Sequence, residues 1–272
     1  MGLLIIRLLT LINNEKTDST FFHIASTLIE NYSLIAHTSI SEMAKICTVS
    51  KSTMSKFARK IGFDDYYDLK DHAPFVEDRY QNKLNYLTNI ISAIETKGID
   101  AYFEAVEQDI QAVRESLDMA IINEIAQDLI KYKKVASFGL LFSESAALDL
   151  QYKLAYNGKF IYTFQDDKKQ EEFIRNAQED TLIIIFSNSG NFLRQQQLEQ
   201  GNPQKNLFRY TKAKLIAITS DKTINQLSYV DQALTFPHST SIQTHAFLYQ
   251  IIMDIIVSRY RYYIQQDSIQ NE

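Results

Sequence analysis

Five short apolar runs in the second half of the chain constrain its fold more than any other feature. The runs are rich in β-branched and aromatic residues, and stretches of helical character separate them. They read VASFGLLF (135–142), FIYTF (160–164), TLIIIFS (181–187), KLIAITS (214–220) and QALTF (232–236). Runs of this kind are typical of strands buried on both faces, and their alternation with helices indicates βαβ units. The sequence therefore predicts an α/β domain built on a parallel sheet.

The first part of the chain, up to about residue 71, reads as helix throughout. Apolar residues recur at helical spacing in residues 3–11 and 19–31. The sequence SISE at 39–42 has the pattern of a capping box, in which Ser39 and Glu42 satisfy amides at the start of a helix. That helix is expected to end near Cys47.

Further helical patterns lie between this region and the first strand-like run, and another one closes the chain. HAPFVEDRY, with Pro74, marks the junction between the two parts. The last pattern is apolar over more than one face, which is more than a single packing surface requires, and it suggests a homodimer seam. These helices are predicted at 83–95, 102–115, 118–132 (with Asp118 as N-cap) and 240–265.

A short helix after a tight turn carries segregated positive charge. From Met43 to Phe63 there are five basic residues and no acidic one, whereas residues 1–75 as a whole hold eight of each. Met43, Ala44 and Ile46 of the preceding helix and Met54, Phe57 and Ile61 of this one are expected to face the core. The other side then carries Ser50 as the N-cap, followed by Lys51, Ser52, Thr53, Ser55, Lys56, Arg59 and Lys60.

Helix, tight turn and helix in this order is the arrangement that places a second helix in the major groove of double-stranded DNA. Hydroxyl groups and the helix amino end meet phosphates there, while longer side chains reach base edges. A solvated basic helix that binds nothing is the alternative. The cap, the turn length, the small Ala44 and the lack of acidic residues favour DNA binding. The net charge of −5 does not argue against a local patch, because electrostatic fields are screened over roughly 8 Å at physiological salt.

Several other classes of protein are disfavoured by the composition. The single cysteine, Cys47, forms no intrachain disulfide, and no cysteine cluster is present to hold zinc, so no metal or cofactor is expected. The apolar start, MGLLIIRLLTLINN, falls short of the ~20 residues of a membrane span and lacks the features of a signal peptide. We expect a cytoplasmic protein without a membrane partner.

The stretch SISEMAKICTVSKSTMSKFARKIGFDDYYDLK resembles the amino-terminal domain of the RpiR-type (MurR/RpiR-like) bacterial transcriptional regulators. Lys56 stands where that family commonly has arginine, which keeps the charge but loses the bidentate geometry of a guanine contact. The resemblance implies an inverted-repeat DNA operator, a homodimer or dimer of dimers, and a sugar-isomerase-type (SIS) domain that senses a sugar phosphate. The predicted regions are a helix-turn-helix domain at 1–77, a helical linker at 78–132 and a SIS-like sensing and dimerisation domain at 133–272.

The predicted fold class is thus α/β: an all-α helix-turn-helix domain followed by a SIS-type parallel-sheet α/β/α domain. Two strand-to-helix turns in the second domain are rich in small hydroxyls. Such turns aim backbone amides and helix amino ends at one point, which suits a phosphate, although ordinary helix capping is the alternative. The predicted phosphosugar ligands are Ser143, at the start of its helix, and Ser187, Asn188, Ser189 and Gly190.

This region departs from the family pattern at two positions. Leu141 replaces the second glycine of the usual G-x-G-x-S turn, and Phe192 replaces the threonine of S-x-S-G-x-T. The pocket is therefore expected to be narrower, to prefer another sugar, or to have lost its ligand. In the last case the SIS domain serves only to hold subunits together.

A sugar-phosphate isomerase is the remaining alternative, and it requires a general base beside the sugar. The candidates are Glu144, His238 and His245, and no feature of the sequence pairs them. Each is interpreted as structural, so no catalytic residue is predicted and the chain is not expected to be an enzyme.

Overall fold

The computed structural model describes residues 3–73, 86–196, 204–238 and 240–270. The described residues form two compact units, residues 3–73 and the residues from 86 onward. Within these ranges no helix is long and apolar enough to cross a membrane. The predicted junction at HAPFVEDRY lies almost entirely outside the described residues.

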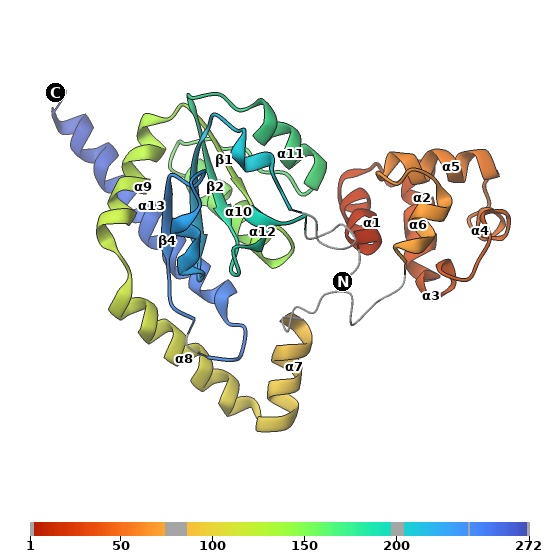
Figure 1. Ribbon diagram of the computed structural model, residues 1–272, viewed down its shortest axis with the longest axis horizontal. Helices are drawn as coiled ribbons and strands as arrows, with labels where there is room; N and C mark the ends of the chain where they lie inside the picture. The colour runs from red at the N-terminus through yellow and green to blue at the C-terminus, as the bar shows by residue number, and fades with distance from the viewer. Residues whose placement is uncertain (1–2, 74–85, 197–203, 239, 271–272) are drawn as a thin grey trace. The chain divides into compact units, whose positions relative to one another are not determined.

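The first unit consists of helices joined by short turns (Figure 1). The capping box is confirmed, because the Ser39 hydroxyl accepts from the Glu42 amide and the Glu42 carboxylate accepts from the Ser39 amide. The short helices α3 and α6 were not predicted. The helices are α1 (Leu3–Asn14), α2 (Thr20–Glu30), α3 (Tyr32–Ile35), α4 (Ile40–Ile46), α5 (Lys51–Lys60) and α6 (Tyr66–Asp71).

The inward face of α4 differs from the prediction at one residue. Met43 and Ala44 are buried as expected, but the Ile46 side chain is 39% exposed. Cys47, one residue further along, is fully buried instead. Residues 43, 44 and 47 share one face of a helix, so the prediction of an inward Ile46 was wrong. Ile46 and Cys47 differ in direction by about 100° around the helix axis.

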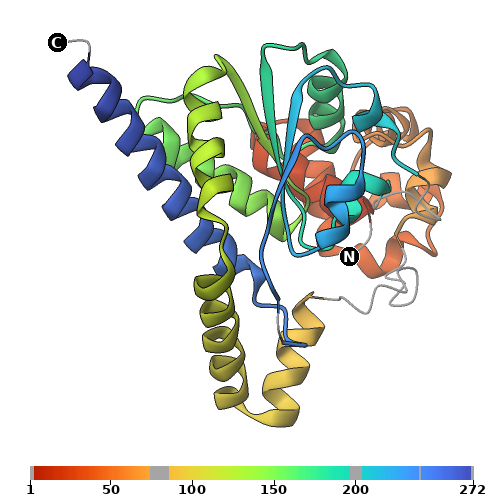
Figure 2. The same ribbon diagram turned by 60° about the vertical axis from the view of Figure 1, so that its left-hand side comes forward.

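The second unit begins with helices and then alternates strands with helices. Helices α7 and α8 pack against each other as a hairpin that turns at Gly98 (Figure 2). The helices are α7 (Tyr86–Lys97), α8 (Ile99–Ser116), α9 (Met119–Lys131), α10 (Phe142–Ala155), α11 (Asp167–Asn176), α12 (Asn191–Arg194) and α13 (His245–Gln270), with 3-10 turns η1 (Leu207–Arg209) and η2 (Lys222–Gln226).

The predicted parallel sheet is confirmed. Its strands are β1 (Lys134–Phe138), β2 (Thr181–Phe186), β3 (Lys214–Thr219) and β4 (Gln232–Thr235), all parallel and adjacent in this order. One face packs against α9, α10 and α13, and the other packs against α11 and the short helices that follow β2 and β3. Buried on both faces, the strands have no polar alternation, as their sequences indicated.

Two predicted elements of the second unit need correction. FIYTF does not form a strand: it contributes a single bridge between Tyr162 and Ala136. The last helix begins at His245 rather than at Thr240. The Thr240 and Thr244 hydroxyls bond to the Asp109 side chain, and this segment runs in a non-helical path toward α8.

Candidate functional site

The turn between α4 and α5 fixes the direction of α5. Thr48 adopts a left-handed backbone conformation with φ of 55°, and the Val49 amide donates to the Ala44 carbonyl at 2.8 Å. A β-branched residue rarely adopts positive φ, so this turn is strained. The Ser50 hydroxyl accepts from the Thr53 amide at 3.1 Å, which confirms Ser50 as the N-cap of α5.

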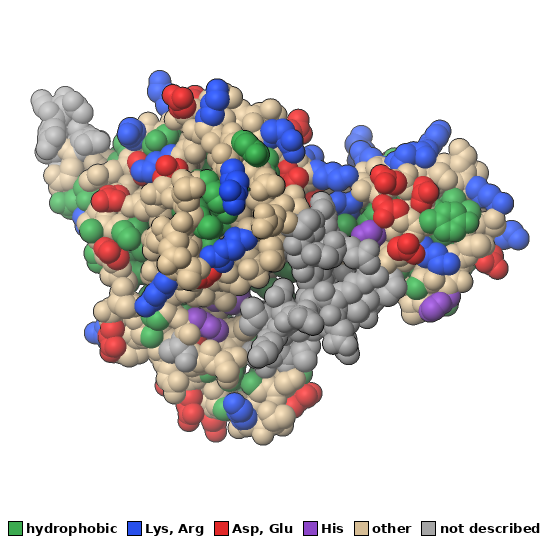
Figure 3. Space-filling view, viewed as in Figure 1, with side chains coloured by type: hydrophobic (Ala, Val, Ile, Leu, Met, Phe, Trp, Pro, Cys, Tyr) green, Lys and Arg blue, Asp and Glu red, His purple; other side chains and the backbone are tan. Residues whose placement is uncertain are grey.

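The two faces of α5 differ completely in character. Met54, Phe57 and Ala58 are fully buried. The predicted outward orientation of the other face is confirmed, and Lys and Arg side chains line this edge of the first unit (Figure 3). Ser50, Lys51, Ser52, Lys56, Arg59 and Lys60 are exposed, and Thr53 and Ser55 are partly exposed.

The position of Lys51 is informative because it opposes the helix dipole. Lys51 is the first residue of α5, and the first turn of that helix holds no acidic side chain. A cation at a helix amino end is unfavourable by about 0.3–1 kcal/mol, whereas an anion there is stabilised. A lysine at this position therefore does not stabilise the folded chain. It would, however, attract a phosphate group that approaches the amino end of the helix.

The first strand-to-helix turn of the second unit keeps the shape of a glycine turn without the glycine. Leu141 has φ of 56° and ψ of −118°, and the Ser143 amide donates to the Leu140 carbonyl at 3.1 Å. These angles are those of the first corner of a type II′ turn, which glycine normally occupies. The backbone shape that the sequence pattern requires is thus retained, at the cost of strain at Leu141.

Replacing Leu141 with glycine should raise the free energy of unfolding of the second unit by about 1–2 kcal/mol, because the Cβ penalty disappears. The Leu141 side chain is 40% exposed, so little burial is lost. Differential scanning calorimetry of the full chain measures the effect. Leu140→Gly is the matched control, since Leu140 lies outside the left-handed region and should only lose stability. A less stable Leu141→Gly protein would contradict the assignment of strain.

Ser143 lies in the first turn of α10, and the helix that was predicted to start at Ser143 begins one residue earlier. The helix starts at Phe142, and Leu141 occupies the N-cap position without a side-chain hydrogen bond. Gly139 allows this turn to close, because a Cβ at this residue would lie 2.5 Å from the Ser143 carbonyl oxygen.

The second turn, after β2, is held by its own serine hydroxyls. The Ser187 hydroxyl accepts from the Phe192 amide at 3.3 Å, and the Ser189 hydroxyl accepts from the Asn191 amide at 3.4 Å. Gly190 has φ of 69°. The buried Asn188 side-chain oxygen has no hydrogen-bond partner among the described residues.

A third turn, after β3, contacts the second one and was not predicted from the sequence. The Asn188 carbonyl accepts from the Ser220 amide at 3.0 Å, from the Ser220 hydroxyl at 2.8 Å and from the Thr219 hydroxyl at 3.1 Å. Arg194 adds an ion pair to Asp221 at 2.5 Å. The signal was present in the sequence, because the run KLIAITS also ends in two hydroxyl residues.

Phe192 does not narrow the site in the way that the sequence suggested. Its side chain is 2% exposed and packs edge-to-face on Phe208, with ring centroids 5.8 Å apart. The Lys205 ammonium lies 4.1 Å from the centre of the Phe192 ring. Phe192 thus packs in the core beneath the turn. Its effect on the site is that the hydroxyl of the usual threonine is absent.

The three candidate bases differ in their surroundings. Burial raises the pKa of Glu144, whose carboxylate bonds to Gln165. Burial and the neighbouring His238 lower the pKa of His245 to about 4, so this imidazole is neutral at pH 7. The ring centroids of His238 and His245 lie 6.4 Å apart, and His238 Nε2 lies 3.7 Å from a carboxylate oxygen of the buried Asp109. No group of His, Cys, Asp and Glu within the described ranges is arranged to hold a metal ion.

Comparison with known proteins finds relatives of both units. A family model described as the helix-turn-helix domain of the rpiR family matches residues 6–81. The HTH-type transcriptional regulator HexR of Escherichia coli (strain K12) is 27% identical over 221 residues, which cover 77% of this chain and 72% of that protein. An HTH-type transcriptional regulator in the aarA 3′ region of Providencia stuartii is 26% identical over 197 residues, 70% of this chain and 67% of the relative.

A solved structure shares the fold over nearly the whole chain. It is the Vibrio vulnificus NanR protein complexed with ManNAc-6P, with a TM-score of 0.51 and 16% identity. The match covers 98% of this chain and 96% of that chain. At this level of identity the likeness concerns the fold alone.

Proposed function

We infer that this chain, whose first domain is an rpiR-family helix-turn-helix and whose second is sugar-isomerase-like, is a transcriptional regulator that binds DNA through α5 and a phosphorylated sugar through its serine turns. The observation that carries the DNA half is the exposed cationic face of α5, free of acidic residues and opposite a buried apolar face. In the proposed complex the outer face of α5 enters the major groove, with Ser50, Lys51 and Ser52 at phosphates. The remaining proposed contacts come from Thr53, Ser55, Lys56, Arg59 and Lys60.

The proposed effector site lies where β1 and β2 end. The register pairs Phe138 with Ile185, so the turns that follow these neighbouring parallel strands open at the same edge of the sheet. Ser143, Ser187, Asn188, Ser189 and Gly190 are the proposed phosphate ligands, and Thr219 and Ser220 brace the Asn188 turn. Each hydrogen bond to a phosphate contributes roughly 1.5–3 kcal/mol, so four of them support micromolar binding after the costs of association.

A thermal-shift screen of the full chain against hexose 6-phosphates and amino-sugar 6-phosphates tests the effector half. A ligand present at about 100 times its dissociation constant should add about 2.7 kcal/mol of stability. Ser187→Ala combined with Ser189→Ala should remove the shift. Ser116→Ala on α8, whose hydroxyl bonds only within its helix, is the matched control. If no sugar phosphate shifts the unfolding temperature, the SIS domain is a scaffold that has lost its ligand.

The sugar-isomerase alternative has less support. The named relatives are transcriptional regulators. A turnover assay with the sugar phosphates that bind would distinguish the two functions. We place the regulator in the cytoplasm, with the DNA that it binds.

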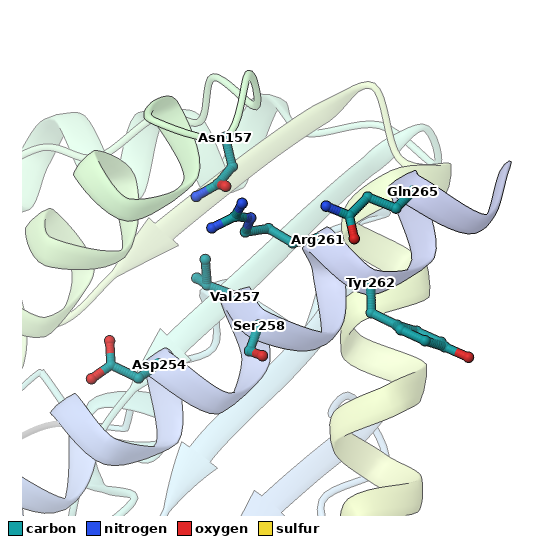
Figure 4. Close-up of a pocket in the computed structure, with 7 residues that line it drawn as sticks. All are labelled: Asn157, Asp254, Val257, Ser258, Arg261, Tyr262 and Gln265. Atoms are coloured by element: carbon teal, nitrogen blue, oxygen red, sulfur yellow. The ribbon is translucent and has the colours of Figure 1, made fainter. Parts of the chain in front are cut away.

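A dimer is the assembly that an inverted-repeat operator requires. We propose that the subunits pair through the face formed by α10 and α13. Tyr152, Tyr156 and Phe160 on and after α10 are 58%, 92% and 77% exposed, an unusual density of aromatic surface. Next to them lies an open hollow in which Arg261 and Asn157 point toward one another (Figure 4). It is lined by Asn157, Asp254, Val257, Ser258, Arg261, Tyr262 and Gln265.

A further inference from the structure

The segment between β4 and α13, residues 238–244, connects two parts of the second unit that are far apart in sequence. We call it the coupling segment; its residue 239 lies outside the described residues. It starts at the carboxyl edge of the sheet, the edge that also carries the serine turns. From there it extends to helices α7 and α8 and returns to the start of α13 (Figures 1 and 2).

An apolar anchor holds the coupling segment to the α7–α8 hairpin. Ile242 is 5% exposed and packs in one cluster with Ala93 of α7 and Ala105 of α8. Ile90 and Tyr102 pack against the same cluster. A displacement of Ile242 therefore has to move one or both helices, because a packed core does not deform continuously.

A polar anchor lies on α8 close to the apolar one. Asp109 has no exposed surface, and its carboxylate accepts from the Thr240 hydroxyl at 2.8 Å and from the Thr244 hydroxyl at 2.5 Å. His238 Nε2 lies 3.7 Å from the same oxygen. Burial of a carboxylate is expensive, and an apolar side chain would pack here at lower cost. Buried polar contacts of this kind are best known for fixing one arrangement among several.

The other end of the coupling segment reaches the effector site through the first turns of α13. The ring of His245 lies 5.7 Å from the ring of Tyr249. The Tyr249 side chain is fully buried in the apolar cluster that also holds Ala146 and Ala147 of α10, the helix whose first turn carries Ser143. Packing contacts thus run from the start of α10, which carries Ser143, through Tyr249, His245 and the coupling segment, to Asp109 on α8.

We propose that the coupling segment transmits occupancy of the serine turns to the α7–α8 hairpin, through the Asp109 hydrogen bonds and the Ile242 anchor. The α7–α8 hairpin precedes the sheet in the chain and follows the DNA-binding domain, so it is the element through which a signal leaves the second unit. This inference rests on the proposed function. It adds that particular residues, which contact neither DNA nor sugar, carry the response.

The test compares operator affinity with and without sugar phosphate in full-length variants. The operator is a duplex selected from a random library, and the probes are the hexose and amino-sugar 6-phosphates of the thermal-shift screen. Thr244→Val and Asp109→Asn remove hydrogen bonds of the polar anchor with little change of shape. Ile242→Ala shortens the apolar anchor. Thr244→Ser keeps the hydroxyl and is the matched control.

The expected result is that the wild type and Thr244→Ser change their operator affinity at least fivefold when the sugar phosphate is added. The three anchor variants should bind the sugar phosphate with an affinity within about threefold of that of the wild type. Their operator affinity should no longer change when the sugar phosphate is added; these variants are Thr244→Val, Asp109→Asn and Ile242→Ala. Variants that keep the full response would overturn the coupling role and leave the proposed function intact. Variants that lose sugar binding would make the segment part of the effector site. If no probe stabilises the wild type, the effector proposal itself fails, and the coupling role fails with it.

Discussion

Replacement of Lys51 and Lys56 together with alanine should weaken operator binding about 100-fold at physiological salt. Both side chains are exposed on α5, and each is expected to contact a phosphate. A hydrogen bond to a charged group contributes about 1.5 kcal/mol or more, so two of them amount to about 3 kcal/mol, or two factors of ten. The slope of log affinity against log salt should fall by about two units, because two fewer counterions are released. Fluorescence anisotropy across a salt series measures both quantities.

Lys16→Ala is the control for the effect of net charge alone. Lys16 is exposed in the same unit but lies between α1 and α2, outside the proposed contact face. It should leave the affinity and the salt slope close to those of the wild type. If the Lys51 and Lys56 double variant binds as the wild type does, the contact face has been assigned to the wrong surface.

Replacement of Gly139 with alanine should lower the free energy of unfolding of the second unit by about 2–4 kcal/mol. The added Cβ would lie 2.5 Å from the Ser143 carbonyl oxygen and 2.6 Å from its carbon, and both are backbone atoms of the first turn of α10. Neither can move unless the turn opens, and overpacking of this kind is among the more costly substitutions. Sugar-phosphate binding should be lost as well, because Ser143 is displaced. Calorimetry and the thermal-shift screen report the two effects.

Gly158→Ala separates this clash from the general effect of removing a glycine. Gly158 has φ of +77°, and a Cβ there would meet nothing within 4 Å. The substitution should lower the free energy of unfolding by about 1 kcal/mol, because alanine is unfavourable in this backbone conformation. An equal loss of stability in the two variants would show that the Gly139 turn has room to adjust.

Much of the fold follows from local rules that act within one segment. Capping at Ser39, Ser50 and Asp118 is decided by residues two or three positions apart, and the structure bears out all three predictions. The parallel sheet follows from runs that are apolar on both faces. Predictions failed where a distant residue decided the outcome. The Thr240–Thr244 stretch has a helical pattern, but it bonds to Asp109, more than 130 positions away in sequence.

The sequence predicts a candidate site at the turns after β1 and β2, but it does not predict the conformation of these turns. Side-chain types alone suggested that Leu141 and Phe192 disturb the effector site. In the structure Leu141 keeps a backbone conformation typical of glycine, and Phe192 is buried in the core. Backbone dihedral angles and side-chain direction are properties of the folded chain, and a single sequence contains no direct record of them.

One titration tests the central claim most directly. The full-length wild-type protein is titrated onto its selected operator in the absence and in the presence of each sugar 6-phosphate of the screen. We expect at least one of them to change the dissociation constant of the operator complex fivefold or more. An operator affinity that stays the same with every member of the panel would contradict the account of an effector-controlled regulator.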